Sequence, residues 1–160
     1  MTFPPIVLAS ASLRRRDLLG QIGIEPVAIT PANIGETPFQ RELPQRYALR
    51  MAREKALAAV LPNNVKDNAV VLAGDTVVSV GRRILPKAET EDQARACLAL
   101  LSGRGHRVYG GIALRLADGT LRSRVVKSSV VFKRLHHDEI DAYIATDDWQ
   151  GKAGGYAIQG

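Results

Sequence analysis

Residues 69–76 read Ala-Val-Val-Leu-Ala-Gly-Asp-Thr, and this stretch decides the fold. Its first five residues are apolar without a break, which is typical of a strand covered on both faces of a sheet. A strand of this kind predicts an α/β protein, with helices packed against the sheet. Asp75 follows the strand and a glycine, where α/β folds place catalytic and metal-binding acids. An aspartate that caps a turn is the alternative, and spacing alone does not separate the two.

The sequence before this stretch alternates between strand and helix patterns. An apolar run predicts a short strand at 6–9, and Ser10-Ala11-Ser12 can cap the helix that follows and ends at Gly23. A second strand is predicted at 25–29 and a polar loop at 30–43. Pro44 then suits the start of a helix that runs to about residue 60. One face of the first helix carries Leu13, Leu18, Leu19 and Ile22, and the stripe of the second includes Ala48, Met51, Ala52, Ala56 and Ala59.

The sequence after residue 76 continues the alternation. Residues 77–80 and 84–85 flank Gly81-Arg82-Arg83, which predicts a tight hairpin, and a capping box at 90–93 opens a helix. Two long strands, at about 107–116 and 121–132, are joined by Asp118-Gly119, a type I′ turn signal. A short helix at about 138–145 and a Gly-rich tail come next. The whole chain, 1–160, is therefore predicted to be one α/β domain with a mixed, twisted sheet and flanking helices.

Composition narrows the class of protein. The chain has 160 residues, 46% of them hydrophobic, with a net charge of +6 and a pI near 9.8, so an anionic partner is expected. Aromatic residues make up 5%, which argues against the stacking platforms of single-strand binders and favours a small phosphorylated ligand. No apolar run approaches the roughly 20 residues of a membrane span. The single cysteine, Cys97, suits a reducing compartment, and we expect a cytoplasmic protein.

The start of the first helix is the first candidate site. Ser10, Arg14 and Arg15 lie where backbone amides and the positive end of the helix dipole favour an anion. Cations at a helix N-terminus oppose that dipole, and a bound polyphosphate would explain them because Arg binds phosphate oxygens in bidentate fashion. A solvated basic face is the alternative.

Several other polar residues are weaker candidates when each is taken alone. Lys55 lies on or beside an apolar helix stripe, where it either extends to solvent or reaches into a polar pocket. Glu36 is either a second carboxylate of a metal site or an exposed loop acid. Asp75 could ligate Mg²⁺ or activate a water, with the Thr76 hydroxyl beside it. Lys87 is either a surface lysine or part of a site. The tail with Gln159 is either a flexible end or part of a site.

Seven segments in order resemble one family, the Maf-like nucleotide pyrophosphatases. They are Leu-Ala-Ser-Ala-Ser-Leu-Arg-Arg (8–15), Gly-Glu-Thr (35–37), Ala-Arg-Glu-Lys-Ala (52–56), Ala-Gly-Asp-Thr (73–76), Ile-Leu-Pro-Lys (84–87), Leu-Ser-Gly-Arg-Gly-His (101–106) and Lys-Ala-Gly-Gly-Tyr-Ala-Ile-Gln-Gly (152–160). The resemblance implies an inosine-triphosphatase-like α/β fold and hydrolysis of a nucleoside triphosphate to the monophosphate and pyrophosphate. It also implies a divalent cation, Mg²⁺ or Mn²⁺, and often a homodimer.

The resemblance also implies a role for each candidate residue. Asp75 and Glu36 would hold the metal, Asp75 would be the general base, and Lys55 would complete the catalytic group. Thr76 after the aspartate resembles the branch that acts on dTTP and UTP. The remaining substrate-binding residues would be Ser10, Arg14 and Arg15 on the triphosphate, and Lys87 and Gln159 on phosphate and base.

Other interpretations stay open from the sequence. The same hydrolysis of modified nucleotides is one, and a nucleotide-binding, division-linked regulator without turnover is another. Non-specific nucleic-acid binding is weaker, and neither a specific nucleic acid nor a membrane is expected as a partner. Because relatives continue through a further strand and helix, we also expect that a C-terminal segment is missing from this chain.

Overall fold

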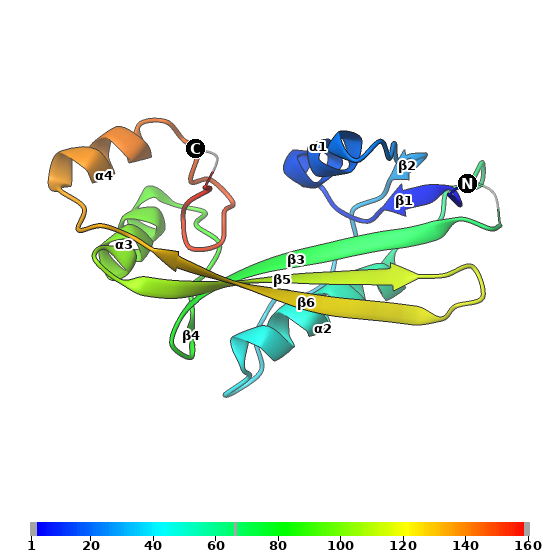
Figure 1. The fold of residues 1–160 in the computed structure, drawn as a ribbon, viewed down its shortest axis with the longest axis horizontal. Coiled ribbons are helices and arrows are strands. Elements are labelled where there is room, and N and C mark those ends of the chain that lie inside the picture. Colours follow the sequence, from blue (N-terminus) through cyan, green and yellow to red (C-terminus); the bar gives the residue numbers. More distant parts are fainter. Residues whose placement is uncertain (1–2, 66, 159–160) are drawn as a thin grey trace. The chain divides into compact units, whose positions relative to one another are not determined.

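The computed structural model describes residues 3–65 and 67–158, which form two compact units. The first contains the described residues of 1–42, 46–75 and 110–125, and the second those of 43–45, 76–109 and 126–160. Figure 1 shows the elements of both units. The prediction of one domain over 1–160 stays a prediction.

The first unit begins with a parallel arrangement of short strands. Val7 of β1 (Ile6–Leu8) pairs with Ala28 of β2 (Ala28–Ile29) on one side and with Val71 of β3 (Val70–Val80) on the other. α1 (Leu13–Gln21) connects β1 to β2, and α2 (Pro44–Ala58) precedes β3. These elements confirm the predicted order, with Pro44 as the first residue of its helix.

Within the described residues the sheet order is β2-β1-β3-β5-β6, and β4 (Arg83–Ile84) pairs with β3 in antiparallel fashion. Strands β5 (Gly105–Arg115) and β6 (Leu121–Val131) are the two long consecutive strands that the sequence predicts. Parallel and antiparallel pairs occur in the same sheet, so the predicted mixed α/β fold class is confirmed.

Strand β3 corrects one expectation. The sequence predicts a strand at 69–73 and a separate one at 77–80, with Asp75 between them, but β3 is one uninterrupted strand from Val70 to Val80. Asp75 is therefore a strand residue, and the turn-capping alternative is wrong. Alternation along the strand places Asp75 on the same face as Ala73, which belongs to the same buried cluster as Ala52 and Ala56 of α2.

Small side chains allow α2 to lie close to the sheet. The core of this unit is largely alanine and valine, namely Val7, Ala9, Ala52, Ala56, Ala59, Ala69, Val71, Ala73 and Ala113. A Cβ atom on Gly111 of β5 would lie 2.2 Å from the backbone oxygen of Ala48, so a glycine is required at this contact. Arg115 donates hydrogen bonds to the carbonyl oxygens of Leu57 and Ala59, which satisfies the C-terminal end of α2.

Helix α1 differs from its prediction. The helix forms, but none of its residues is buried. Leu13 and Leu18 of the helix are exposed, and so is Ile22, the residue after it. The side chain of Ser12 makes no capping hydrogen bond. Apolar periodicity identifies the face that a helix can bury, and it does not guarantee that another element covers that face.

The second unit packs α3 (Glu91–Leu101) beside α4 (His137–Ile144) (Figure 1). The predicted capping box at the start of α3 is present, with Thr90 and Gln93 exchanging side-chain and backbone hydrogen bonds. The buried face of α3 consists of Ala94, Cys97, Leu98 and Leu101. The predicted hairpin at Gly81 is also confirmed, with Ser79 opposite Ile84.

The turn between β5 and β6 is not the predicted type. A type I′ turn needs a positive φ at both central residues, but Gly119 has φ +84° and Asp118 is not in that region. Instead, Gly119 donates to the Leu116 carbonyl, and Thr120 N–H donates to the Asp118 carboxylate. The Asp118 side chain therefore stabilises the turn by accepting a hydrogen bond. The prediction of a hairpin is confirmed, and the prediction of a type I′ turn is wrong.

Candidate functional site

Lys55 lies between two carboxylates in the first unit. Its Nζ is 2.6 Å from Asp75 Oδ1 and 2.7 Å from Glu36 Oε1. Lys55 and Asp75 are 7% and 3% exposed, and the Glu36 side chain is 32% exposed. Of the alternatives for Lys55, the polar pocket is correct and extension to solvent is wrong. Removal of the Lys55 ammonium would take this partner from the buried Asp75 carboxylate, which is costly.

The fold explains how this triad assembles. Lys55 shares an α2 turn with Ala52 and Ala56, which pack against β3, so its side chain is directed to the face where Asp75 lies. Glu36 comes from the loop before α2, and it is the outermost of the three groups. The structure thus brings the three predicted catalytic residues together.

Ser10 and Arg15 form a second polar group in the same unit. Arg15 Nη1 donates to Ser10 Oγ at 2.8 Å, and the Ser12 backbone N–H donates to the same oxygen at 3.2 Å. The Arg15 side chain also passes Gly74, where a Cβ would lie 3.2 Å from Arg15 Nε. Gly74 therefore leaves room for the arginine directly beside Asp75 in the chain. Arg14 occupies the same first turn of α1 and is half-buried.

Electrostatic effects connect Arg15 to the triad. Burial lowers the pKa of the Arg15 guanidinium, and the negative charges of Asp75 and Glu36 oppose that shift. Arg14 adds a smaller lowering of the same pKa. Arginine nonetheless stays protonated in proteins, so Arg15 presents a fixed positive charge near two acids. A group with this balance of charges can hold a phosphate oxygen and a cation side by side.

Tyr47 is a site neighbour that the sequence analysis missed. Burial, followed by the charges of Asp75 and Glu36, raises the pKa of Tyr47 to about 12. Its phenol therefore stays neutral near the acids. Positions 47, 51 and 55 are four residues apart, so Tyr47 lies on the same helix face as Lys55, and that spacing was the available signal.

Arg50 was also missed, and it holds the loop that follows Glu36. Its Nε and Nη2 donate to the two carboxylate oxygens of Glu42 at 2.7 and 2.8 Å, and Nη2 also donates to the Thr37 carbonyl. The guanidinium carbon lies 3.8 Å from the centre of the Phe39 ring. The hydrogen bond from Arg50 lowers the pKa of Glu42, and the same bond raises the pKa of Arg50. The loop at 37–42 is thereby fixed to α2.

Three further site residues were predicted, namely Thr76, Lys87 and Gln159. Thr76 and Lys87 are exposed residues of the second unit, and Gln159 lies outside the described residues. The backbone at Lys87 forms an antiparallel bridge with Ala153 of the tail. Gly154 and Gly155 of that tail are buried, so the alternative of a flexible end is wrong for them.

The carboxylates at Lys55 fit a hard divalent cation in part. Asp75 and Glu36 both contact the Lys55 ammonium, so the two carboxylates lie close together. Across residues 3–65 and 67–158, no cluster of three or more His, Cys, Asp or Glu residues could hold a metal ion. Mg²⁺ commonly uses one or two carboxylates and completes its shell with water and substrate phosphates, so the donor set suits that mode of binding.

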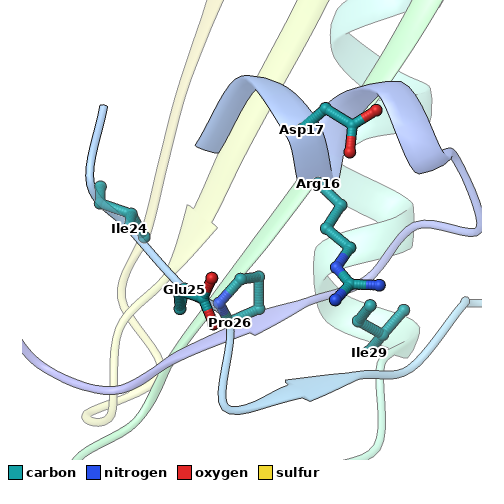
Figure 2. Close-up of a pocket in the computed structure, with 6 residues that line it drawn as sticks. All are labelled: Arg16, Asp17, Ile24, Glu25, Pro26 and Ile29. Carbon is teal, nitrogen blue, oxygen red and sulfur yellow. The ribbon is translucent and has the colours of Figure 1, made fainter. Parts of the chain in front are cut away.

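A pocket elsewhere in the first unit does not coincide with this group. Figure 2 shows that Arg16, Asp17, Ile24, Glu25, Pro26 and Ile29 line it. None of the predicted site residues is among them, and its charged side chains have both signs.

Among the described residues, no helix has the length and apolar character needed to cross a membrane.

The fold and this group of charges define the class of protein: an α/β protein with a mixed sheet of the Ham1 type and a cluster of acids and bases suited to phosphate. The solved structure of the Ham1 protein from Staphylococcus aureus aligns with a TM-score of 0.50 at 16% identity, over 78% of this chain and 70% of that one. At this identity the likeness shows the fold alone.

The chain belongs to the family of Maf-like proteins, whose family model matches residues 5–160. It is 57% identical to the dTTP/UTP pyrophosphatase of Maricaulis maris over 98% of this chain and 74% of that protein. It is 60% identical to the protein of the same name from Rhodospirillum rubrum, over 98% of this chain and 73% of that protein. The resemblance seen in the sequence is confirmed.

Proposed function

We propose that this chain hydrolyses nucleoside triphosphates, dTTP and UTP in particular, to the monophosphate and pyrophosphate. The observation that carries the proposal is the Lys55 ammonium held between Asp75 and Glu36, in the unit that also carries the Ser10–Arg15 pair. Relatives named dTTP/UTP pyrophosphatase, 53–60% identical to this chain, support the choice of substrate.

The substrate-binding part of the proposal uses the start of α1. Arg14 and Arg15 bind oxygens of the triphosphate, and Ser10 fixes the guanidinium of Arg15 through the 2.8 Å hydrogen bond. This bond holds Arg15 in one rotamer before the substrate arrives, so less entropy is lost on binding. Lys87 and Gln159 add contacts to phosphate and base, and Thr76 contributes to the choice of base.

The chemical step transfers the α-phosphoryl group to water. The water oxygen forms a bond to the α-phosphorus, the bond from that phosphorus to the α–β bridging oxygen breaks, and pyrophosphate leaves with the electron pair. Asp75 accepts the proton of the water. Lys55 fixes the orientation of the Asp75 carboxylate, and its charge, with that of Arg15, stabilises the negative charge that develops on the departing pyrophosphate.

Asp75 and Glu36 would also hold Mg²⁺ or Mn²⁺. When bound, such an ion neutralises phosphoryl oxygens and lowers the pKa of a coordinated water. The proposal further includes a homodimer and a cytoplasmic location, which rest on the sequence resemblance and on the lone cysteine. Sedimentation at several protein concentrations tests the dimer.

The test of the function is pyrophosphate release from dTTP, UTP, CTP, GTP and modified purine triphosphates, with Mg²⁺ or Mn²⁺. We expect release with dTTP and UTP, its loss with EDTA, and its loss in Asp75→Asn. Asp67→Asn, which neutralises an aspartate outside the site, is the matched control and should stay active. Full activity of Asp75→Asn would contradict the mechanism, and nucleotide binding without release would indicate a binding protein.

A further inference from the structure

The tail of the second unit runs back against the segment that carries Lys87. Ala88 N–H donates to the Lys152 carbonyl at 3.0 Å, and Gly151 N–H donates to the Ala88 carbonyl at 2.7 Å. Gly154 N–H donates to the Pro86 carbonyl at 3.0 Å. The backbone on both sides of Lys87 is therefore hydrogen-bonded to the tail. If the tail moves, this support of the Lys87 backbone is lost.

The tail fits its path closely at two glycines. Gly154 and Gly155 both have φ +70°, which favours glycine. A Cβ on Gly154 would lie 2.9 Å from Val78 Cγ1, and one on Gly155 would lie 3.1 Å from Ala94 Cα. The backbone of the tail thus contacts β3 and α3 directly, and a side chain that anchors it there would keep it in place.

The next residue, Tyr156, is anchored by a buried histidine. His106 on β5 is 2% exposed, and its Nε2 lies 2.6 Å from the Tyr156 hydroxyl. The His106 ring makes edge-to-face contacts with Phe132 and Tyr156, at centroid distances of 5.0 and 5.5 Å. Nδ1 of His106 is buried and makes no hydrogen bond of good geometry within the described residues. The groups that face this ring are thus a phenol, an aromatic ring and the nearby backbone of Arg104.

Packing alone does not account for a histidine at this position. A buried polar atom without a good hydrogen bond costs about 1–3 kcal/mol, and a leucine would fill similar space without that cost. What histidine adds is the hydrogen bond to Tyr156. That bond connects the first half of β5 to the end of the tail, and the tail in turn is bonded to residues 86 and 88.

We propose that His106 is a positioning residue, which acts through Tyr156 and the tail to hold Lys87 in place for phosphate binding. The inference rests on the proposed function for the role of Lys87. The coupling of His106 to the backbone around Lys87 does not depend on any substrate.

The first test is amide hydrogen exchange in the protein without nucleotide, read at Ala88 and Gly154. We expect exchange there to become about 3- to 10-fold faster in Tyr156→Phe, which removes the hydroxyl and keeps the ring, and also in His106→Leu, since one hydrogen bond is lost. His106→Gln can still reach the hydroxyl with its amide and should restore part of the protection. Tyr109→Phe removes a phenol hydroxyl elsewhere on β5 and should change nothing.

The second test is the kinetics of dTTP hydrolysis in the same variants. Tyr156→Phe and His106→Leu should raise KM by about the same factor as the exchange rates and change kcat less, with partial rescue in His106→Gln. Exchange at Ala88 and Gly154 that stays at the wild-type rate, or that rises equally throughout the second unit, overturns the proposal. So does an unchanged KM. If wild-type protein releases no pyrophosphate, the proposed function fails, and hydrogen exchange alone still decides whether His106 positions the tail.

Discussion

Replacement of Lys55 by methionine tests the central group of charges. Methionine keeps much of the length and apolar volume of the lysine stem but removes the charge that lies 2.6 Å from Asp75 Oδ1. Asp75 is 3% exposed, so the substitution leaves a desolvated carboxylate, and breaking a buried pair in this way typically costs about 3–5 kcal/mol. Glu36 is partly exposed and can be rehydrated, so we expect the lower end, about 3 kcal/mol.

The assay is urea unfolding at pH 7, followed by circular dichroism. With a slope of about 1–3 kcal/mol per molar, a loss of about 3 kcal/mol lowers the midpoint by at least about 1 M. Lys127→Met replaces an exposed lysine and should move the midpoint very little.

The double variant makes the prediction specific. If the cost comes from the Asp75 carboxylate that loses its ammonium partner, then adding Asp75→Asn to Lys55→Met should recover about 1–2 kcal/mol, because the asparagine is neutral. Additive losses in the double variant, or a loss below about 1 kcal/mol in Lys55→Met, would refute the view that these charges depend on one another.

Three further predictions concern stability. Gly111→Ala should lower the free energy of unfolding by about 1–3 kcal/mol in thermal melts, because its Cβ would lie 2.2 Å from the backbone oxygen of Ala48. Gly110→Ala is the control and should be nearly neutral, because its Cβ would have no atom within 4 Å. Burial lowers the pKa of His106, so as pH falls the unfolded state binds this proton before the folded state does, and stability should fall as pH drops below about 6.5. The urea midpoints at pH 7.5 and 5.5 should therefore differ less in His106→Gln than in the wild-type protein. Thr90→Ala should cost about 1 kcal/mol through loss of the capping box, and an unchanged melting temperature would contradict that role.

Local signals in the sequence predicted most of the elements. The apolar run at 69–73, the proline at position 44 and the capping box at 90–93 each depend on neighbours in the chain, so no tertiary information was needed. The family motifs went further and selected Lys55, Asp75 and Glu36 as one group. Spacing alone left a surface position and a polar pocket open for Lys55, because helix periodicity identifies a face and not what covers it.

The errors arose where distant parts of the chain decide the outcome. The pattern divides residues 69–80 into two strands, whereas β3 runs through Gly74 and Asp75 to Val80, and Gly74 lies against Arg15 from a distant part of the chain. Arg50 was overlooked because its partners, Glu42 and the Thr37 carbonyl, are in a loop whose path no sequence pattern predicts. The roles of Thr76, Lys87 and Gln159 stay predictions.

The attachment of the 37–42 loop to Arg50 has a consequence for how the site meets its ligand. Ordering a loop costs about 1–2 kcal/mol per residue in backbone entropy alone. Since Arg50 already fixes this loop through Glu42, Thr37 and Phe39, most of that loss occurs during folding. In the proposed function, Glu36 would therefore meet an ion or nucleotide next to a loop that is already ordered, and binding would not require a slow closing of this loop.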